Sequence, residues 1–147
     1  MLRILGRKNS INVIKVLWCA DELGLEVERV DIGGAFGGND QPDYLAKNPM
    51  GRVPTIEDGP VVLWESHTIV RYLAEKHGHG TLWAQDPGER AKSSIWMDWY
   101  LAHLHPPMTT IFWNLVRHAP EDRDMDAVAA AIEEGKQLWS VLDRHLE

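Results

Sequence analysis

Residues 48–69, NPMGRVPTIEDGPVVLWESHTI, decide the interpretation of the fold. Two short apolar runs, 53–56 and 61–64, flank residues 57–60, whose Asp-Gly pair is typical of a β-hairpin turn. Apolar side chains then recur at helical spacing from Ser66 to His77. This stretch therefore predicts a strand–strand–helix unit.

The residues before this unit predict a strand–helix–strand arrangement. Residues 2–5 have a strand pattern, and residues 13–23 carry apolar side chains at helical spacing up to Gly24, which suits a left-handed C-terminal cap. Residues 26–32 predict a second strand, and the glycine-rich loop 33–38 and a short helical piece at 42–45 follow it. The expected order is thus βαβ followed by ββα.

The residues after this unit contain no strand pattern. Residues 78–88 are rich in glycine, proline and polar side chains, so we expect one domain over residues 1–80 and an all-helical domain over residues 88–147. Helical pieces are expected over 89–105, from 108 to 116, and from Asp124 onward, with Pro106 and Pro107 breaking or kinking the chain between the first two. Because three helical pieces form only a thin bundle, we expect an apolar face to remain uncovered.

Composition narrows the classes of function. The 147 residues are 44% hydrophobic and 25% charged, as in a globular protein. A net charge of −7 without a basic cluster disfavours nucleic acid as a partner. No stretch is apolar enough to span a membrane and no signal-peptide pattern is present, so we expect no membrane partner and a cytoplasmic location. Cys19, the single cysteine, suits a small core residue, and the closely spaced histidine pairs lack metal-ligand spacing, so we expect no metal.

Three segments carry candidate chemistry, and the first is GRKNSINVIKVL at residues 6–17. It joins a strand to a helix and places Ser10 beside the amide groups of the first helical turn, a position that favours anions. From this segment alone, helix capping by Ser10 or Asn12 is the simpler interpretation.

The other two segments surround the hairpin. Pro54 stands at the head of a strand, where a missing N–H is tolerated, and a turn with a cis Val53–Pro54 bond is one interpretation of this segment. That turn would expose the backbone N–H and C=O of Val53 to an extended peptide, whereas an ordinary trans proline at a sheet edge is the alternative. In WESHTI, residues 64–69, Ser66 at a helix N-terminus can hold a carboxylate and Glu65 an ammonium, although plain capping would also explain the pair.

Together, these three segments in a βαβ–ββα order resemble the N-terminal domain of the cytosolic glutathione transferases, of the serine type, over residues 1 to about 80. The resemblance implies an α/β thioredoxin-like N-terminal domain followed by a partial all-α helical domain. Residues 88–147 resemble only the first part of the family's helical domain, so we expect that domain to be truncated.

The resemblance also implies roles for particular residues. Ser10 would be the hydroxyl that activates the glutathione thiol, with Asn12 or Asn9 as the alternative activating group, because some relatives use an asparagine there. The glutathione-binding residues implied by the same matches are Asn9, Arg52, Val53, Pro54, Glu65 and Ser66. Val53 would clamp the cysteinyl part through its backbone, and Glu65 with Ser66 would anchor the γ-glutamyl end. Because the family clamps a peptide backbone at this strand, we predict that the Val53–Pro54 bond is cis.

The implied activity is a glutathione transferase reaction, in which the glutathione thiolate adds to a small hydrophobic electrophile. Two alternatives stay open. One is glutathione-dependent reduction of peroxides or disulfides. The other is a non-catalytic interaction module, favoured by the short helical half and by His67, which stands where relatives often have arginine. The exposed apolar stripes and the family's usual assembly predict a homodimer.

Overall fold

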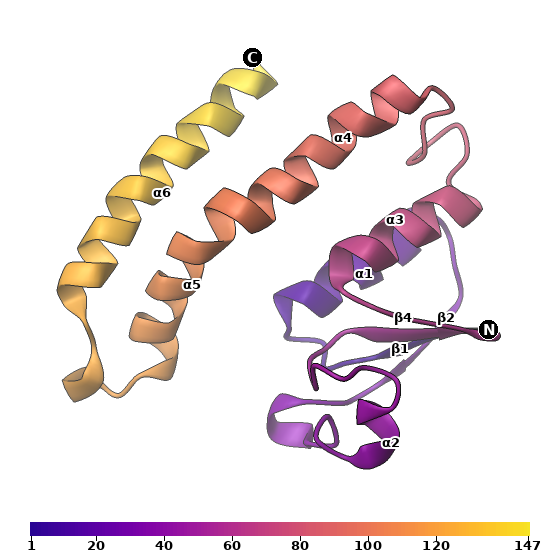
Figure 1. The fold of residues 1–147 in the computed structure, drawn as a ribbon, viewed down its shortest axis with the longest axis horizontal. Helices are drawn as coiled ribbons and strands as arrows, with labels where there is room; N and C mark the ends of the chain where they lie inside the picture. The colour runs from indigo at the N-terminus through magenta and orange to yellow at the C-terminus, as the bar shows by residue number, and fades with distance from the viewer. The chain divides into compact units, whose positions relative to one another are not determined.

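The computed structural model describes all 147 residues and divides into two compact units, Met1–Pro87 and Gly88–Glu147 (Figure 1). The first unit contains four strands and three α-helices. In chain order its elements are β1 (Leu2–Leu5), α1 (Ile11–Glu22), β2 (Val27–Val30), a 3-10 turn η1 (Gly34–Phe36), α2 (Pro42–Leu45), β3 (Thr55–Asp58), β4 (Val61–Trp64) and α3 (Ser66–His77). The predicted βαβ–ββα order is confirmed.

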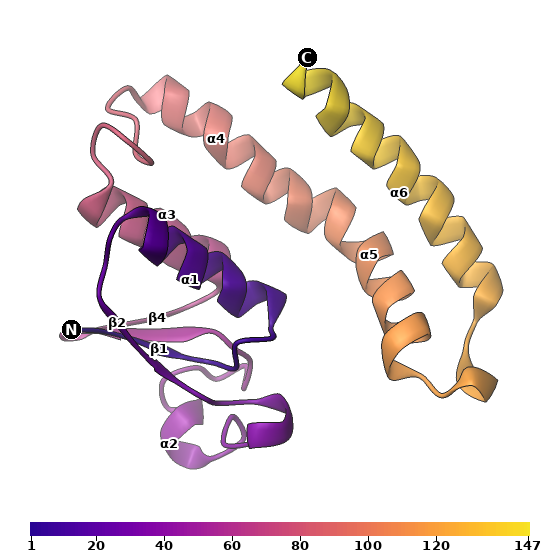
Figure 2. The same cartoon turned by 180° about the vertical axis from the view of Figure 1, so that it is seen from behind.

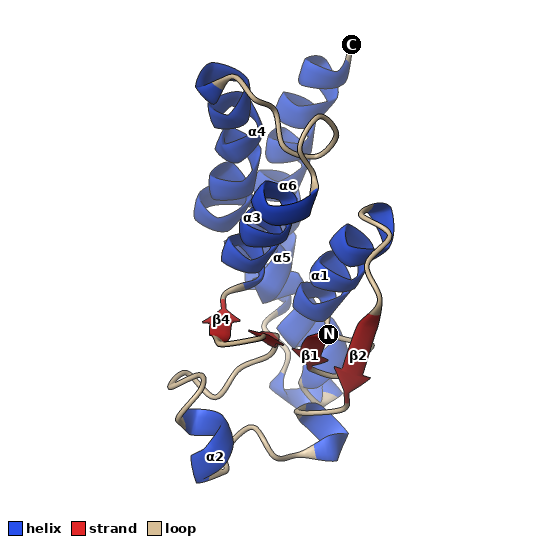
Figure 3. Ribbon diagram, turned by 90° about the vertical axis from the view of Figure 1, so that its right-hand side faces the viewer, coloured by secondary structure: helices blue, strands red, loops and turns tan.

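The four strands form one mixed sheet in the order β2-β1-β3-β4. β1 is parallel to β2 and antiparallel to β3, which in turn is antiparallel to β4. Helices α1 and α3 pack against each other on one face of the sheet, and α2 lies on the opposite side (Figures 2 and 3). This is the thioredoxin-like arrangement that the resemblance implies.

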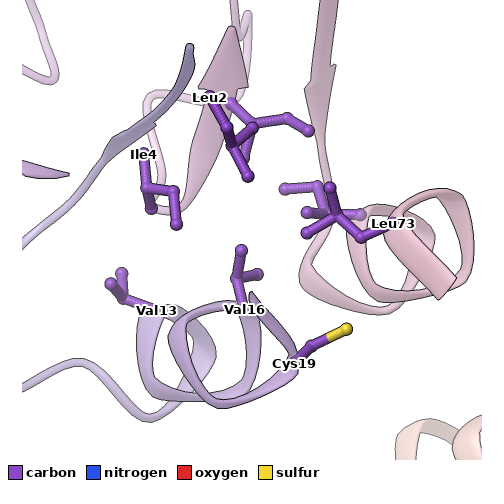
Figure 4. Packing of buried hydrophobic residues seen from close by; sticks show 8 residues of the cluster. Leu2, Ile4, Val13, Val16, Cys19 and Leu73 are labelled. Carbon is purple, nitrogen blue, oxygen red and sulfur yellow. The ribbon is translucent and has the colours of Figure 1, made fainter. Parts of the chain in front are cut away.

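The core of the first unit lies between the sheet and these two helices (Figure 4). Ile4 of the central strand β1 is fully buried, as are Val13 and Val16 of α1 and Leu73 of α3. Cys19 is buried beside them, which confirms its interpretation as a small core residue. Replacing one of these larger side chains by alanine would typically cost about 2–5 kcal/mol of stability. The core thus fixes the two helices whose N-termini carry the candidate site.

The ends of the helices agree with the sequence prediction more closely than the ends of the strands do. Gly24 has φ +63° just after α1, the left-handed conformation expected of a glycine C-cap. The first hairpin strand, expected over 53–56, instead runs over Thr55–Asp58. The reason is its register, because Thr55 and Asp58 pair with Leu5 and Leu2 at the two ends of β1.

The second unit is entirely helical. Its elements are α4 (Pro87–Trp99), a π-helical turn η2 (Tyr100–Leu104), α5 (His105–Phe112), a second π-helical turn η3 (Trp113–Arg117), a 3-10 turn η4 (Pro120–Asp122) and α6 (Met125–Leu146). The chain stays helical through Pro106 and Pro107, but the α-helix is interrupted just before them, since α4 ends at Trp99 and α5 starts at His105 after the π-helical turn η2. The prolines occupy the first turn of α5, where a missing N–H is tolerated.

Helix α6 packs against α5 and reaches α4 at its far end. The rings of Trp96 in α4 and His145 in α6 have centroids 4.4 Å apart. Asp124 caps α6, since its side chain accepts a hydrogen bond from Ala127 N at 2.9 Å. Large apolar side chains are exposed along α6, as predicted for an uncovered apolar stripe. The Trp139 side chain, for example, is 50% exposed.

Candidate functional site

The first part of the candidate site is the turn between β1 and α1. Ser10 is the N-cap residue of α1 and only 8% exposed, and its backbone carbonyl accepts from Ile14 N at 2.9 Å. Its side chain, however, makes no capping hydrogen bond to the helix amides. The hydroxyl is therefore not used as a helix cap, which weakens the simpler interpretation of Ser10. The first turn of α1 carries no acidic residue that would repel an anion.

The flanking Asn9 is held by Arg7. The Arg7 guanidinium donates from Nη1 to Asn9 Oδ1 at 2.9 Å and to the Asn9 backbone carbonyl at 3.2 Å. The Arg7 side chain crosses Gly34, where a Cβ atom would lie 2.8 Å from Arg7 Cδ and Nε. Gly34 also has φ +60°, so its lack of a side chain makes this close approach possible. Asn9 is thus exposed and engaged away from the helix start.

Asn12 links the two helix N-termini. Its Oδ1 accepts from Lys15 Nζ at 3.0 Å and lies 3.5 Å from Ser66 Oγ, at the outer limit of a hydrogen bond. Lys15 Nζ also lies 3.2 Å from His67 Nε2. Burial lowers the pKa of the Lys15 ammonium, and the nearby Glu65 carboxylate partly opposes this effect. The structure therefore brings Asn12 together with Glu65 and Ser66.

The second part of the site is the segment that precedes β3. The Val53–Pro54 peptide bond is cis, as predicted, and Pro54 is buried. The side chain of Arg52 is exposed, but its backbone carbonyl accepts two hydrogen bonds, from Tyr44 Oη at 2.5 Å and from Asn48 Nδ2 at 2.8 Å. These two bonds hold the peptide group that directly precedes Val53.

Sequence reasoning missed this buried polar network. Tyr44, Asn48 and Thr55 are 4%, 1% and 0% exposed. Tyr44 Oη and Asn48 Nδ2 both lie close to Thr55 Oγ1, at 2.9 and 3.1 Å, and Asn48 Oδ1 accepts from Met50 N at 3.1 Å. The available signal was the order Asn48-Pro49-Met50-Gly51, which is typical of a turn. An asparagine in such a turn can bond to nearby backbone groups, and these bonds satisfy its side chain when it is buried.

Two glycines make room for Val53. A Cβ atom on Gly6 would lie 3.3 Å from Val53 Cβ, and a Cβ atom on Gly33 would lie 3.3 Å from Val53 Cγ1. Gly6 directly follows β1 and stands four residues before Ser10, and Gly33 stands in the loop after β2. The Val53 segment thus packs directly against the two loops that leave the parallel strands.

The third part of the site is the start of α3. Glu65 is its N-cap residue, with φ +68°, an uncommon conformation for a residue with a side chain. Its carbonyl accepts from Ile69 N at 2.9 Å, while its side chain makes no capping hydrogen bond. Ser66 is the first residue of the helix and is 7% exposed. The Glu65 side chain does not cap α3, and the contact of Ser66 Oγ with Asn12 Oδ1 is long at 3.5 Å, so both side chains can serve a ligand.

The structure shows neither a metal-binding group nor a membrane-spanning helix. No group of three or more histidine, cysteine, aspartate or glutamate side chains is arranged to hold a metal ion. No helix combines the length and the apolarity required for crossing a lipid bilayer. The arrangement that the structure does present is a pair of helix N-termini joined by neutral and charged polar side chains, next to a backbone segment with its own buried support.

Comparisons with known proteins agree on one family. Residues 2–75 match the family model described as "Glutathione S-transferase, N-terminal domain". The glutathione S-transferase GstB of Escherichia coli strain K12 is 43% identical over 148 residues, which cover 99% of this chain and 71% of that protein. Glutathione S-transferase 3 of Zea mays is 34% identical, covering 97% of this chain and 64% of that protein.

A solved structure is also closely similar. It is the theta class glutathione S-transferase of Xanthomonas axonopodis pv. citri with glutathione bound, which is 46% identical and superposes with a TM-score of 0.93. The superposition covers 99% of this chain and 70% of that one. The apo form of the same enzyme superposes with a TM-score of 0.82. The similarity thus includes both units of the chain.

Proposed function

Since the chain belongs to the glutathione S-transferase family and takes glutathione as its cosubstrate, we propose that Ser10 activates the glutathione thiol for attack on small hydrophobic electrophiles. The observation that carries the proposal is the Ser10 hydroxyl, which sits at the N-terminus of α1 without capping it. A hydroxyl in this position can donate to a sulfur anion placed against the helix start.

The chemistry requires a thiolate at neutral pH. A cysteine-type thiol has a pKa of about 8.5, so only a few per cent is ionised near pH 7. A hydrogen bond from Ser10 together with the helix N-terminus favours the anion, and lowering the thiol pKa by roughly two units corresponds to about 2.7 kcal/mol. The thiol proton passes to solvent, and the thiolate forms a C–S bond with the electrophilic carbon; with an aryl halide, the carbon–halogen bond breaks and halide leaves. Ser10 forms no covalent bond.

The remaining candidate residues would bind rather than activate. The backbone of Val53, next to Pro54, would pair with the cysteinyl part of glutathione as a short added strand. Ser66 and the α3 amides would hold the γ-glutamyl carboxylate, and Glu65 the ammonium group. The exposed Arg52 would make a polar contact at the rim. Asn12 and Asn9 are the alternative activating groups.

Two serine variants separate activation from binding. We expect Ser10→Ala to lower kcat for conjugation of an aryl halide by about ten- to a thousandfold, or about 1.4–4 kcal/mol, with little change in glutathione affinity. Ser66→Ala should instead raise KM for glutathione and leave kcat nearly unchanged. Ser140→Ala, on the exposed surface of α6, is the matched control and should change neither constant.

The outcomes decide between the hypotheses. If Ser10→Ala keeps full turnover and an unshifted thiol pKa, the activating role passes to Asn12 or Asn9. If the wild-type chain binds glutathione but conjugates no electrophile, the interaction-module hypothesis replaces the transferase reaction. Glutathione-dependent peroxide reduction, assayed in parallel, would support the third hypothesis.

We also propose that the chain forms a homodimer and is cytoplasmic. Support for the dimer comes from exposed apolar side chains along α6, such as Met125, Ile132 and Trp139. Sedimentation at micromolar concentration should give twice the monomer mass, and a monomer would contradict the proposal. A buried, unpaired Cys19 suits a reducing compartment, and cell fractionation tests the location.

A further inference from the structure

Arg7 holds both polar atoms of the peptide group that leads into Ser10. The Ser10 N–H donates to the Arg7 carbonyl at 3.2 Å, and the Asn9 carbonyl accepts from Arg7 Nη1, also at 3.2 Å. These two atoms belong to one planar peptide unit, the bond between Asn9 and Ser10. A single residue, through its backbone and its side chain, therefore restrains the peptide plane from which Ser10 starts.

Arg7 is in turn fixed by the strand and the loop beside it. Its N–H donates to the Ile32 carbonyl at 3.0 Å, just beyond the paired residues of β1 and β2. Its side chain lies across Gly34, where an added Cβ atom would be 2.8 Å from Arg7 Cδ and Nε. Its Nη1 also donates to Asn9 Oδ1 at 2.9 Å. The guanidinium is thus confined between the loops that leave the two parallel strands.

Stability alone does not account for an arginine at this position. Arg7 Nε is buried and has no hydrogen-bond partner, and a buried N–H without a partner lowers stability. The hydrogen bonds that the guanidinium does make go to Asn9, the residue directly before Ser10. The side-chain contacts of Arg7 are therefore concentrated on the turn that carries the Ser10 hydroxyl.

The direction of the Ser10 hydroxyl depends on this turn. Its side chain makes no capping hydrogen bond, so the position of its Cβ atom follows from the backbone, at φ −93° and ψ 125°. A displacement of about 1 Å in a group that acts on the transition state can lower a rate by about a hundredfold. A looser Asn9–Ser10 peptide would therefore misplace the hydroxyl relative to a bound sulfur.

We propose that Arg7 is a positioning residue, which holds the Asn9–Ser10 peptide so that the Ser10 hydroxyl is directed at the glutathione sulfur. This inference rests on the proposed function, in which Ser10 activates the thiol. Gly34 belongs to the same arrangement, because a residue without a side chain leaves room for the Arg7 guanidinium. Arg7 acts through Ser10 and takes no part in the chemical step.

The first test is Arg7→Met, which keeps an unbranched side chain but removes its donors. We expect kcat for conjugation of an aryl halide to fall about five- to fiftyfold, while KM for glutathione changes by less than about twofold. The pKa of the bound glutathione thiol, followed by the ultraviolet absorbance of the thiolate against pH, should rise by roughly one unit. Arg3→Met removes ion pairs with Glu28 and Glu57 on the same strand, so it is the matched control and should change neither kcat nor the thiol pKa.

A double-mutant cycle tests whether Arg7 acts through Ser10. In Ser10→Ala there is no hydroxyl to position, so adding Arg7→Met should lower kcat by less than about twofold. If kcat falls by the same factor in both backgrounds, or if Arg7→Met alone leaves kcat and the thiol pKa unchanged, the proposal is overturned. If Ser10→Ala alone keeps full turnover, the proposed function of Ser10 fails, and this inference fails with it.

A variant on the other loop perturbs the same arrangement and remains available if Arg7→Met does not fold. Gly34→Ala places a methyl group 2.8 Å from Arg7 Cδ and Nε, so the guanidinium has to move. We expect kcat to fall about three- to thirtyfold, with no further loss when Arg7→Met is added. Gly37→Ala is the matched control and should keep kcat, because Gly37 also has a positive φ of +62° but no atom within 4 Å of the added Cβ. Equal kcat values in the two glycine variants would refute the role of Arg7.

Discussion

Replacing Asn48 by alanine should weaken glutathione binding although Asn48 is not itself among the residues proposed to contact the ligand. Asn48 is 1% exposed and donates to the Arg52 carbonyl and to Thr55 Oγ1, while it accepts from Met50 N. The variant removes all three bonds and leaves the Met50 amide without its partner. At about 1 kcal/mol net for each bond, we expect the free energy of unfolding to fall by about 2–4 kcal/mol.

The functional consequence follows from the Arg52 carbonyl. Tyr44 alone would hold it after the substitution, so the peptide group before Val53 would lose one of its two anchors. Losing one well-aligned backbone hydrogen bond to glutathione would cost about 1 kcal/mol, which corresponds to a rise of about fivefold in KM for glutathione. The kcat should change little, because Ser10 lies on a different loop.

The chain offers a matched control in its second unit. Asn114 is also buried, donates to the Thr110 carbonyl at 2.9 Å and accepts from Asp124 N at 2.8 Å. Asn114→Ala should destabilise the fold to a similar extent but leave KM for glutathione unchanged. Urea unfolding and glutathione-dependent conjugation rates measure the two effects. If Asn48→Ala raises KM no more than Asn114→Ala does, the Arg52 carbonyl does not position Val53 and the reasoning is refuted.

Three further predictions concern the first unit. Gly6→Ala would place a Cβ atom 2.5 Å from Val13 Cγ2, so we expect a loss of about 1–3 kcal/mol in thermal or urea unfolding; an unchanged midpoint would contradict it. A hydrogen bond from Lys76 lowers the pKa of Asp58. A carboxyl group whose pKa is lower in the folded than in the unfolded chain stabilises the fold at any pH above its unfolded pKa. That contribution is lost as the pH falls through its folded pKa. Asp58→Asn should therefore cost stability at pH 7 and progressively less below about pH 4; a constant difference across this range would argue against the ion pair. Burial raises the pKa of the Cys19 thiol, so a disulfide reagent should modify it much more slowly in the folded than in the urea-unfolded chain at neutral pH; equal rates would show that the thiol is accessible.

Local chemistry made the helices and turns of the first unit predictable. Gly24 marks the end of α1 because few other residues adopt its positive φ without cost, and Asp58-Gly59 marks the hairpin turn for the same reason. The cis bond at Pro54 was predictable from the resemblance of its segment to a family that clamps a peptide backbone there. For the two glycines, the deciding interaction lies within a few residues of the glycine itself.

Features that depend on distant partners were not predictable in this way. The first hairpin strand begins at Thr55 because it pairs with β1, and the position of that pairing cannot be obtained from the hairpin alone. The helix through Pro106 and Pro107 continues because the π-helical turn before it places both prolines in a first turn. The support of the Arg52 carbonyl by Tyr44 likewise depends on a contact between two loops.

Side-chain contacts in the structure also bear on which residue activates the thiol. The sequence left Ser10, Asn9 and Asn12 as alternatives because all three stand near the helix start. Asn9 Oδ1 accepts from Arg7, and Asn12 Oδ1 accepts from Lys15, so both amides are oriented by neighbours with other roles. Ser10 is the candidate that is both buried and without a capping bond. A free hydroxyl can rotate to donate to an arriving sulfur. Each amide is instead oriented by the bond at its Oδ1, so its Nδ2 can donate only in the direction that this bond sets, and this difference favours Ser10 as the activating group.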